Sequence, residues 1–306
     1  MTSTPLTTND RPSVAGRRPG GPARRRAGGE AVGSSRAWRL SRRTLAVLIG
    51  IAFIFPIYWV FVISVDHPGQ FDSFPPVLVP QWDWSNWSRA WDEAPWVRLL
   101  LNTVLIASGT TVLALITSTL AGFAFGVLRF PGRTALTLLV LSVLMMPTTV
   151  LIIPDYILAS DLHLINTYWI QIIPFGASVF GIFLVRQFFL GMPQELLDAA
   201  SLDGAGRLRV LWYIGVPLVR PALLIIAINS FMGSWNSFLW PEIMTGGGSS
   251  VQPVEVGLST FASTNGTDYS GMAAAVTFTT LPVMVFFLVL QRQFIRGALS
   301  AAGSLK

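Results

Sequence analysis

The chain of 306 residues is 52% hydrophobic and only 12% charged, whereas a typical globular protein has roughly 25% charged residues. Its formal net charge is +6 at pH 7, and it contains no cysteine, which excludes disulfides, iron–sulfur clusters and thiolate zinc sites. The apolar residues form long uncharged blocks, so the composition excludes an ordinary soluble enzyme and predicts an all-α polytopic membrane protein.

The first 40 residues are predicted to be a disordered, basic tail. Residues 1–43 contain ten arginines and only two acidic residues, Asp10 and Glu30. The rest of this segment is rich in Gly, Pro, Ser and Thr and buries too little apolar surface to offset the entropy lost on folding. Because no aromatic stacking platform or folded module accompanies these charges, we expect the tail to contact anionic lipid headgroups and not nucleic acid.

Residues 41–306 are predicted to form one transmembrane domain with six spans. Each span is a run of about 20 or more residues with almost no formal charge, which is enough to cross a hydrocarbon core about 30 Å thick. The predicted spans are residues 44–65, 99–128, 134–159, 164–185, 221–241 and 269–291. Asp155 is the only formally charged residue within any of them.

The distribution of basic residues predicts that both termini are cytoplasmic, because lysine and arginine concentrate on that side of membrane proteins. With the N-terminus inside, 19 of the 21 basic residues fall on the inner side, and only Arg89 and Arg98 fall outside. Five tryptophans follow the first span, which indicates either a segment at the outer lipid interface or a surface that docks a partner. They are Trp82, Trp84, Trp87, Trp91 and Trp96.

Neither a nucleotide site nor a metal site is expected in this chain. Lys306 is the only lysine, so the sequence contains no G-x-x-x-x-G-K-[ST] phosphate-binding loop. His67 and His163 lie far apart, with no partner at metal-ligand spacing. Any ATP-driven work therefore requires another chain that hydrolyses the nucleotide.

Residues 191–218, between the fourth and fifth predicted spans, are predicted to contain a short helix that docks into a groove on a cytoplasmic partner. Pro193 suits the first helical position, Glu195 the positive N-terminal end, and Gly204 the C-terminal cap. The apolar side comprises Leu196, Leu197, Ala200 and Gly204, and the acidic residues Glu195, Asp198 and Asp203 keep the segment at the surface. A lipid-facing helix or a plain connector is the alternative.

The same stretch fits the spacing E-A-A-x3-G-x9-I-x-L-P. Asp198, Ala199, Ala200, Gly204, Ile214 and Pro217 fall on it, and Pro193, Glu195, Asp203 and Ala205 match its fuller form. On these residues the stretch resembles the EAA loop of binding-protein-dependent ABC transporter permeases of the carbohydrate-importer class, with Asp198 in place of the usual glutamate and Val216 in place of the usual leucine. Further resemblances to maltose-type sugar-importer permeases are Asn102-Thr103, Leu164–Thr167, Trp235–Pro241 and the C-terminal stretch Gln291–Gly303.

This resemblance implies the fold of a type I ABC importer permease and a place in a prokaryotic plasma membrane as one half of a pore. The implied partners are a second permease subunit, two ATP-binding subunits that hold ATP and Mg²⁺, and an extracytoplasmic solute-binding protein. The chain itself would be no enzyme and would bind no cofactor.

The resemblance also implies that residues 191–218 transmit ATPase closure to the spans, with Gly204 allowing a sharp turn and Pro217 restarting the next helix. The implied coupling residues are Pro193, Glu195, Asp198, Ala199, Ala200, Asp203, Gly204 and Pro217.

Polar and aromatic residues at or near membrane depth suggest a solute path through Asp155, Asn229, Trp235 and Asn236. Asparagine amides bind sugar hydroxyls and tryptophan rings stack on sugars, while helix packing is the alternative role for each residue. Prolines and glycines within the spans suggest bends that allow two access states, or ordinary lipid-packed kinks. They are Pro56, Pro147, Pro154, Pro174, Pro282, Gly122, Gly126 and Gly233.

A carbohydrate is the expected solute, and glycerol phosphate or a polyol is the alternative within the same class of transporter. A stand-alone secondary transporter is the alternative of another mechanism, and it would use buried ionisable pairs and internal repeats. An intramembrane enzyme would need a catalytic constellation at membrane depth. With Asp155 alone charged in the predicted spans, the sequence favours neither of these two.

Overall fold

The computed structural model describes residues 36–67, 69, 78–263 and 266–303, and most of these residues are helical. The chain divides into two units, Met1–Phe53 and Ile54–Lys306. Within the first unit, the described residues form the beginning of α1 (Arg36–Ser64). The predicted disordered tail, residues 1–40, therefore lies outside the described residues except for the start of this helix.

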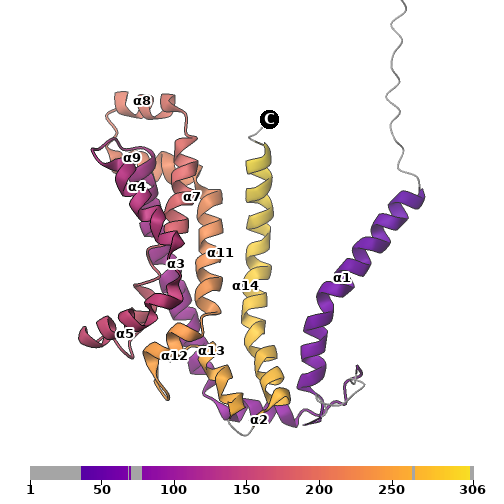
Figure 1. Ribbon diagram of the computed structural model, residues 1–306. Helices are drawn as coiled ribbons and strands as arrows, with labels where there is room; N and C mark the ends of the chain where they lie inside the picture. The colour runs from indigo at the N-terminus through magenta and orange to yellow at the C-terminus, as the bar shows by residue number, and fades with distance from the viewer. Residues whose placement is uncertain (1–35, 68, 70–77, 264–265, 304–306) are drawn as a thin grey trace, which may run out of the picture. The chain divides into compact units, whose positions relative to one another are not determined.

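The second unit begins with the end of α1 and is built from helices (Figure 1). In chain order they are α2 (Ser85–Glu93), α3 (Trp96–Gly126), α4 (Arg133–Ser142), α5 (Ile152–Asp161), α6 (Tyr168–Ile172), α7 (Val179–Leu190), α8 (Gln194–Leu202), α9 (Arg207–Val210), α10 (Val216–Leu218), α11 (Arg220–Trp235), α12 (Leu239–Thr245), α13 (Val254–Leu258) and α14 (Tyr269–Gly303). Short 3₁₀ turns cover Val143–Met145, Thr148–Leu151 and Ser259–Phe261, and a π-helical turn covers Leu211–Gly215. Two-residue strands, β1 (Ala262–Ser263) and β2 (Gly266–Thr267), pair antiparallel. Helices α8 and α9 lie at one end of this unit, and α2, α12 and α13 lie at the opposite end (Figure 1).

Helix α3 packs closely against α7 along a contact line that we call the glycine seam, in which small residues make room for larger side chains. It comprises Ser118, Gly122 and Gly126 on α3 and Gly181, Val185 and Phe189 on α7. An ideal Cβ on Gly122 would lie 2.6 Å from Val185 Cγ1, and one on Gly126 would lie 2.7 Å from Phe189 Cβ. Small residues at four-residue spacing let two helix backbones approach, which is how many helices associate in lipid. Gly122 and Gly126 therefore serve helix packing, and α3 remains a single helix.

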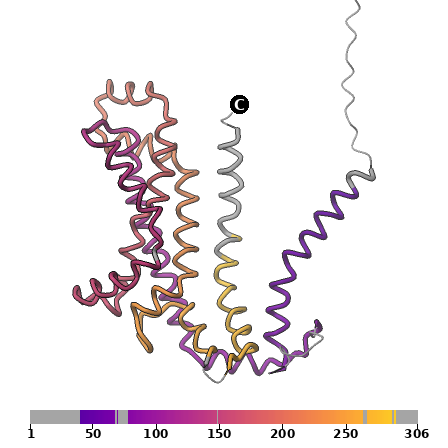
Figure 2. The backbone as a smooth tube through the Cα atoms, viewed as in Figure 1, coloured from indigo at the N-terminus to yellow at the C-terminus, as the bar shows by residue number. Residues whose placement is uncertain are grey.

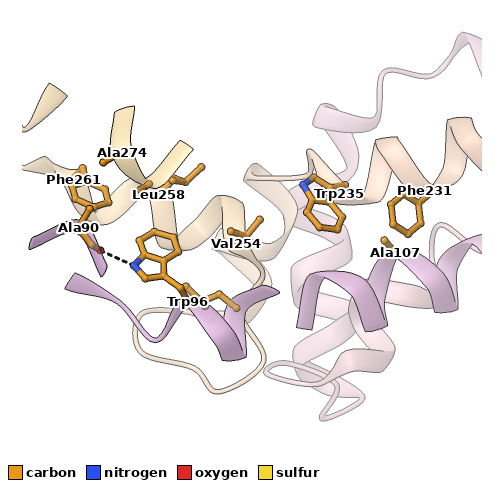
Figure 3. Close-up of a cluster of buried hydrophobic side chains, with 11 residues drawn as sticks. Ala90, Trp96, Ala107, Phe231, Trp235, Val254, Leu258, Phe261 and Ala274 are labelled. Atoms are coloured by element: carbon orange, nitrogen blue, oxygen red, sulfur yellow. Dashed lines mark hydrogen bonds between the residues drawn. The ribbon is translucent and has the colours of Figure 1, made fainter. Parts of the chain in front are cut away.

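Two clusters of buried apolar side chains hold the bundle together. The first joins α3, α7 and α11 to residues 192–219 and contains Ala114, Phe123, Val185, Phe189, Met192, Ala200, Val210, Leu211, Val219, Ala222 and Ile226. The second joins α2, α3, α11, α13 and α14 (Figure 3) and contains Ala90, Trp96, Leu99, Ala107, Phe231, Trp235, Val254, Leu258, Phe261, Ala274 and Ala275. Helices α3, α7 and α11 run alongside one another (Figure 2) and contribute to the first cluster, and α3 and α11 also contribute to the second.

The end of α1 is tied to α2 by side-chain hydrogen bonds. Asn86 Nδ2 donates to the carbonyl oxygens of Ser64 at 3.3 Å and Asp66 at 2.7 Å, and Trp87 Nε1 donates to Ser64 Oγ at 3.2 Å. The last carbonyls of a helix have no partner within it, so a buried asparagine side chain that reaches them stabilises the helix end. Asn86 is fully buried, so α2 starts from a defined position.

The predicted spans are only partly continuous helices. Among the described residues, Leu40–Ser64 and Trp96–Gly126 are single helices long and apolar enough to cross a membrane. The number of such candidate spans rises to four when each of two bent helix pairs is counted as one span. The pairs are Arg133–Met145 with Thr149–Asp161, bent by 85°, and Arg207–Leu218 with Arg220–Trp235, bent by 78°. Val179–Leu190 and Tyr269–Val285 are shorter apolar helices. A count of six spans therefore stays a prediction.

The predicted spans 134–159 and 164–185 are both interrupted, in keeping with the bends expected at Pro147 and Pro174. The first stretch is broken beside Pro147, and the second is divided into α6 and α7 by residues 173–178, which include Pro174. The predicted span 221–241 likewise ends as a helix at Trp235, and α12 begins separately at Leu239. Proline has no backbone N–H and clashes with the preceding turn, so a helix breaks there although the run stays apolar.

Replacing Gly122 by leucine is expected to destabilise the protein, because the new side chain would collide with Val185 and with the backbone of α7. Overpacking of this kind costs about 1–3 kcal/mol. Thermal unfolding of the purified full chain should show a lower midpoint. Gly233→Leu is the matched control, since an ideal Cβ at Gly233 meets no atom within 4 Å. An equal fall of the midpoint in both variants would contradict the close approach of α3 and α7.

Candidate functional site

The segment 191–218 contains the short helix that the sequence predicts. Helix α8 starts at Gln194, so Pro193 is the residue before the helix and not its first residue, with an extended ψ of 132°. Glu195 lies in the first turn, where the helix dipole favours a negative charge. Gln194 Nε2 donates a hydrogen bond to Asp198 Oδ1 at 3.3 Å, one turn further along the exposed surface.

The C-terminal end of α8 is closed by Gly204 in the left-handed conformation, with a φ of +68°. The N–H of Ala205 donates to the carbonyl of Ala200 at 2.9 Å, and the N–H of Gly204 donates to that of Ser201 at 3.1 Å. This pair of bonds is the Schellman arrangement, which favours glycine because a Cβ is strained at positive φ. The predicted cap role of Gly204 is therefore confirmed by its geometry.

Helix α8 has one buried side and one exposed side. Ala200 is buried, at 6% exposure, and packs in the first cluster together with Met192, while Leu197 is partly buried against it. The exposed residues of the helix and its cap include Glu195, Leu196, Asp198, Ala199, Leu202, Asp203 and Gly204, so Leu196 and Gly204 are not part of the buried apolar side that the sequence predicts. Leu202 is 90% exposed, so the helix presents a small apolar surface with an acidic rim at the end of the unit (Figure 1).

The chain reaches α11 from α8 through a sharply bent stretch. Arg207–Leu218 and Arg220–Trp235 meet at 78°. Pro217 lies in α10 before the bend, whereas Pro221 occupies the first turn of α11. A proline therefore stands at a helix start on each side of the bend, Pro217 in the short helix α10 and Pro221 in the long helix α11.

The four residues predicted to line a solute path do not share one surface. Asn229 and Asn236 are exposed on one face of α11, with Gly233 open between them. Trp235 is only 4% exposed, and its ring lies 5.7 Å from that of Phe231 in the second cluster (Figure 3). Asp155 lies apart on α5, a helix that packs against α12. The structure thus gives Trp235 a packing role and leaves the two asparagines accessible.

A set of buried and partly buried hydrogen bonds, which we call the loop clamp, holds residues 250–254 against the bundle. Asn102 Nδ2 donates to the carbonyls of Ser250 at 2.9 Å and Gln252 at 2.8 Å, and Asn102 Oδ1 accepts from the Tyr168 hydroxyl at 2.7 Å. The clamp is completed by the N–H of Val254, which donates to Thr103 Oγ1 at 2.8 Å, and by Gln171 Nε2, which donates to the carbonyl of Val251 at 3.0 Å.

Sequence reasoning singled out Asn102-Thr103, Leu164–Thr167 and Trp235–Pro241 only as resemblances, and the structure brings parts of all three together. The N–H of Asn166 donates to the carbonyl of Met244 at 3.0 Å, and Trp240 Nε1 donates to that of Ile170 at 3.0 Å. Thr167 caps α6. These contacts fix α6 and α12 beside the loop clamp, at the end of the unit opposite α8. The loop partners 250–254 carry no motif that could have revealed them.

Charged groups near this end are mostly structural. Arg89 of α2 forms an ion pair with Asp268 at 3.2 Å, and Asp268 Oδ1 accepts from the N–H of Gly271 at the start of α14. Burial raises the pKa of Glu255 on α13 and that of Asp66 after α1. Among the described residues, no three His, Asp or Glu side chains gather into a group that could hold a metal ion.

Comparison with known proteins gives consistent matches. Residues 118–299 match the family described as binding-protein-dependent transport system inner membrane component. The chain is 34% identical over 263 residues to the sn-glycerol-3-phosphate transport system permease protein UgpE of Yersinia pestis, covering 83% of this chain and 93% of that protein. It is 30% identical over 268 residues to the arabinooligosaccharides transport system permease protein AraQ of Bacillus subtilis, covering 85% of this chain and 94% of that protein.

A solved structure shares the fold. It belongs to a bacterial ABC transporter involved in the import of the acidic polysaccharide alginate, and it matches with a TM-score of 0.71 at 22% identity over 85% of this chain and 98% of that chain. At this identity the likeness concerns the arrangement of the helices.

Replacing Asn102 by aspartate is expected to loosen residues 250–254, because the Nδ2 donor is lost while the acceptor for Tyr168 remains. A fully buried carbonyl without a partner costs about 1–3 kcal/mol, and these partly buried carbonyls cost less than that. Amide hydrogen exchange of the full chain should become at least several-fold faster at residues 250–254 and stay unchanged in α8. Asn229→Asp, on an exposed position, is the control. Unchanged exchange in the Asn102 variant would contradict the clamp.

Proposed function

Since the chain belongs to the family of binding-protein-dependent transport system inner membrane components, we propose that it forms one half of the pore of an ATP-driven importer in a prokaryotic plasma membrane. Its partners are a second permease subunit, two ATP-binding subunits and an extracytoplasmic solute-binding protein. ATP and Mg²⁺ bind to the ATP-binding subunits. This chain contributes the path for the solute and the surface that receives the mechanical work.

The observation that carries this proposal is the construction of α8. Its exposed side has small and acidic residues, including Ala199, Asp198 and Asp203, which suit a shallow groove with basic groups on a cytoplasmic subunit. Its buried side, through Ala200, packs in the same cluster as Phe123 of α3 and Ile226 of α11. A displacement of α8 by the ATPase is therefore passed directly to the long helices.

The orientation follows from the charges around the two ends. Arg129 follows the end of α3, Arg133 begins α4, and Arg207 and Arg209 lie in α9, whose label stands beside α8 at one end of the unit (Figure 1), and basic residues favour the cytoplasmic side. The α8 end is therefore cytoplasmic and the loop clamp is external, and the ten arginines of residues 1–43, with Arg292, Arg296 and Lys306, favour the cytoplasmic side for both chain termini.

The solute is a sugar or a related polyhydroxy compound. Asn229 and Asn236 present amides that donate to and accept from hydroxyl groups, and Gly233 leaves room between them. The named relatives carry sn-glycerol 3-phosphate and arabinooligosaccharides. A phosphate ester requires a cation, and α11 has no basic side chain between Pro221 and Trp235. A phosphorylated polyol would therefore take its cation from another subunit.

Replacing Gly204 by leucine is expected to uncouple ATP hydrolysis from uptake, because a side chain is strained at a φ of +68° and the turn after α8 would shift. In proteoliposomes with the complete transporter, uptake per ATP hydrolysed should fall at least tenfold while the complex still assembles. Gly206→Ala is the control, since Gly206 has an ordinary φ of −66° and open space around it. Unchanged coupling in the Gly204 variant would refute the role of α8.

Replacing Asn229 and Asn236 together by alanine is expected to lower the maximal rate or the apparent affinity of uptake by about tenfold, the amount carried by roughly 1–1.5 kcal/mol of hydrogen bonding. Thermal stability should be unchanged because both side chains are exposed. Trp235→Ala should instead lower the unfolding midpoint, because it opens a cavity in the second cluster. Normal uptake in the double variant would remove these asparagines from the solute path.

A further inference from the structure

The elbow between α2 and α3 forms an open groove of about 490 Å³ that none of the roles above uses. Its lining includes Trp91 at the end of α2, Pro95 at the elbow, and Trp96, Val97, Arg98 and Leu101 in the first turns of α3. All of these side chains except Arg98 are apolar or aromatic.

The wall of this groove is rigid. Trp96 is 1% exposed, its Nε1 donates to the carbonyl of Ala90 at 2.7 Å (Figure 3), and its ring stacks on that of Phe261 at 6.2 Å between centroids. Phe278 of α14 contacts both Trp96, at 5.2 Å, and Trp91, at 5.5 Å. The groove is therefore preformed, which lowers the entropy cost of filling it.

Arg98 is the one charged group of the groove, and its guanidinium has no hydrogen bond or ion pair within the described part of the chain. The other arginine near this end, Arg89, is occupied by Asn86 at 2.8 Å and Asp268 at 3.2 Å. An exposed guanidinium beside an apolar groove is complementary to an anionic group that carries an apolar chain. Guanidinium groups bind phosphate oxygens in a bidentate manner.

The groove continues into an exposed apolar stripe along α3. The stripe consists of Val97, Leu101, Val104, Leu105, Val112, Ile116 and Leu120, each at least 43% exposed. Its members recur at three-, four- and seven-residue steps, so they lie on one face of the helix. Because α3 is long and apolar enough to cross a membrane, this face is suited to lipid chains over its whole length.

We infer that this groove binds a single glycerophospholipid. The Arg98 guanidinium holds the phosphate, the glycerol lies against Pro95 and Trp91, and one acyl chain follows Val97 and Leu101 onto the stripe of α3. Tryptophan rings are favoured at the level of lipid headgroups, where Trp91 is placed by this arrangement. The assignment of this lipid to the outer leaflet rests on the orientation proposed above, whereas the site itself does not.

Retention of phospholipid tests this site. The full-length chain is purified in mild detergent with the subunits that co-purify, delipidated by washing, supplied with phosphatidylethanolamine or phosphatidylglycerol, and examined by native mass spectrometry. The wild type should retain one phospholipid per copy of the chain. Arg98→Gln should reduce this retention at least fivefold, Arg98→Lys should retain part of it, and Arg129→Gln, at the other end of α3, should behave as the wild type.

Two results would overturn the inference. One is a loss of phospholipid that does not depend on Arg98: either the Arg98→Gln variant retains as much phospholipid as the wild type, or the Arg129→Gln control loses as much as the Arg98→Gln variant. The other is that a second permease subunit covers the groove. Because the chain contains no cysteine, Leu101→Cys provides a single reactive thiol. Efficient cross-linking of that thiol to another subunit, without phospholipid retention, would replace the lipid by a protein contact. Labelling of the thiol by a lipid-soluble maleimide, with no such cross-link, supports the lipid.

Discussion

The close approach of α3 and α7 is the contact on which the rest of the bundle depends. In lipid the hydrophobic effect does not drive two helices together, so their association relies on packing at short range. The glycine seam provides that packing, because Gly122 and Gly126 leave room for Val185 and Phe189 where any Cβ would collide. The same buried side chains continue into the first cluster, so the position of α11 and that of residues 192–219 follow from this one approach.

The two functional ends of the second unit are attached to this bundle in different ways. At one end, α8 contacts it through small apolar side chains such as Ala200, which allow the helix to move with the bundle as a unit. At the other end, the loop clamp uses directional hydrogen bonds from Asn102 and Gln171 to main-chain carbonyls. Hydrogen bonds of this kind specify one loop position, because a buried carbonyl without its partner is costly. The proposed function, with motion received at one end and a defined surface presented at the other, requires both kinds of attachment.

Residue type alone does not separate structural from functional roles in this chain. Asn102 lies in the second turn of α3 and Asn229 in the middle of α11, both in apolar helices. Asn102 is buried in the loop clamp, whereas Asn229 is exposed. Trp235 and Trp91 show the same contrast, since Trp235 fills a core and Trp91 lies half-exposed beside the groove at the elbow. In each pair, the neighbours brought by other helices determine the role.

The sequence by itself determined the class of the protein, the long helices α1 and α3, and the short helix α8 with its cap at Gly204, because these depend on local properties: uncharged length, turn preference and fixed residue spacing. The break between Trp235 and Leu239, the packing role of Gly122 and Gly126, and the partners of Asn102 were decided only by the tertiary structure. An apolar run has the same composition whether its helix is straight or broken, and a hydrogen bond between residues 102 and 252 leaves no periodic pattern in the chain. Such features depend on which helices meet, and that information is distributed over the whole bundle.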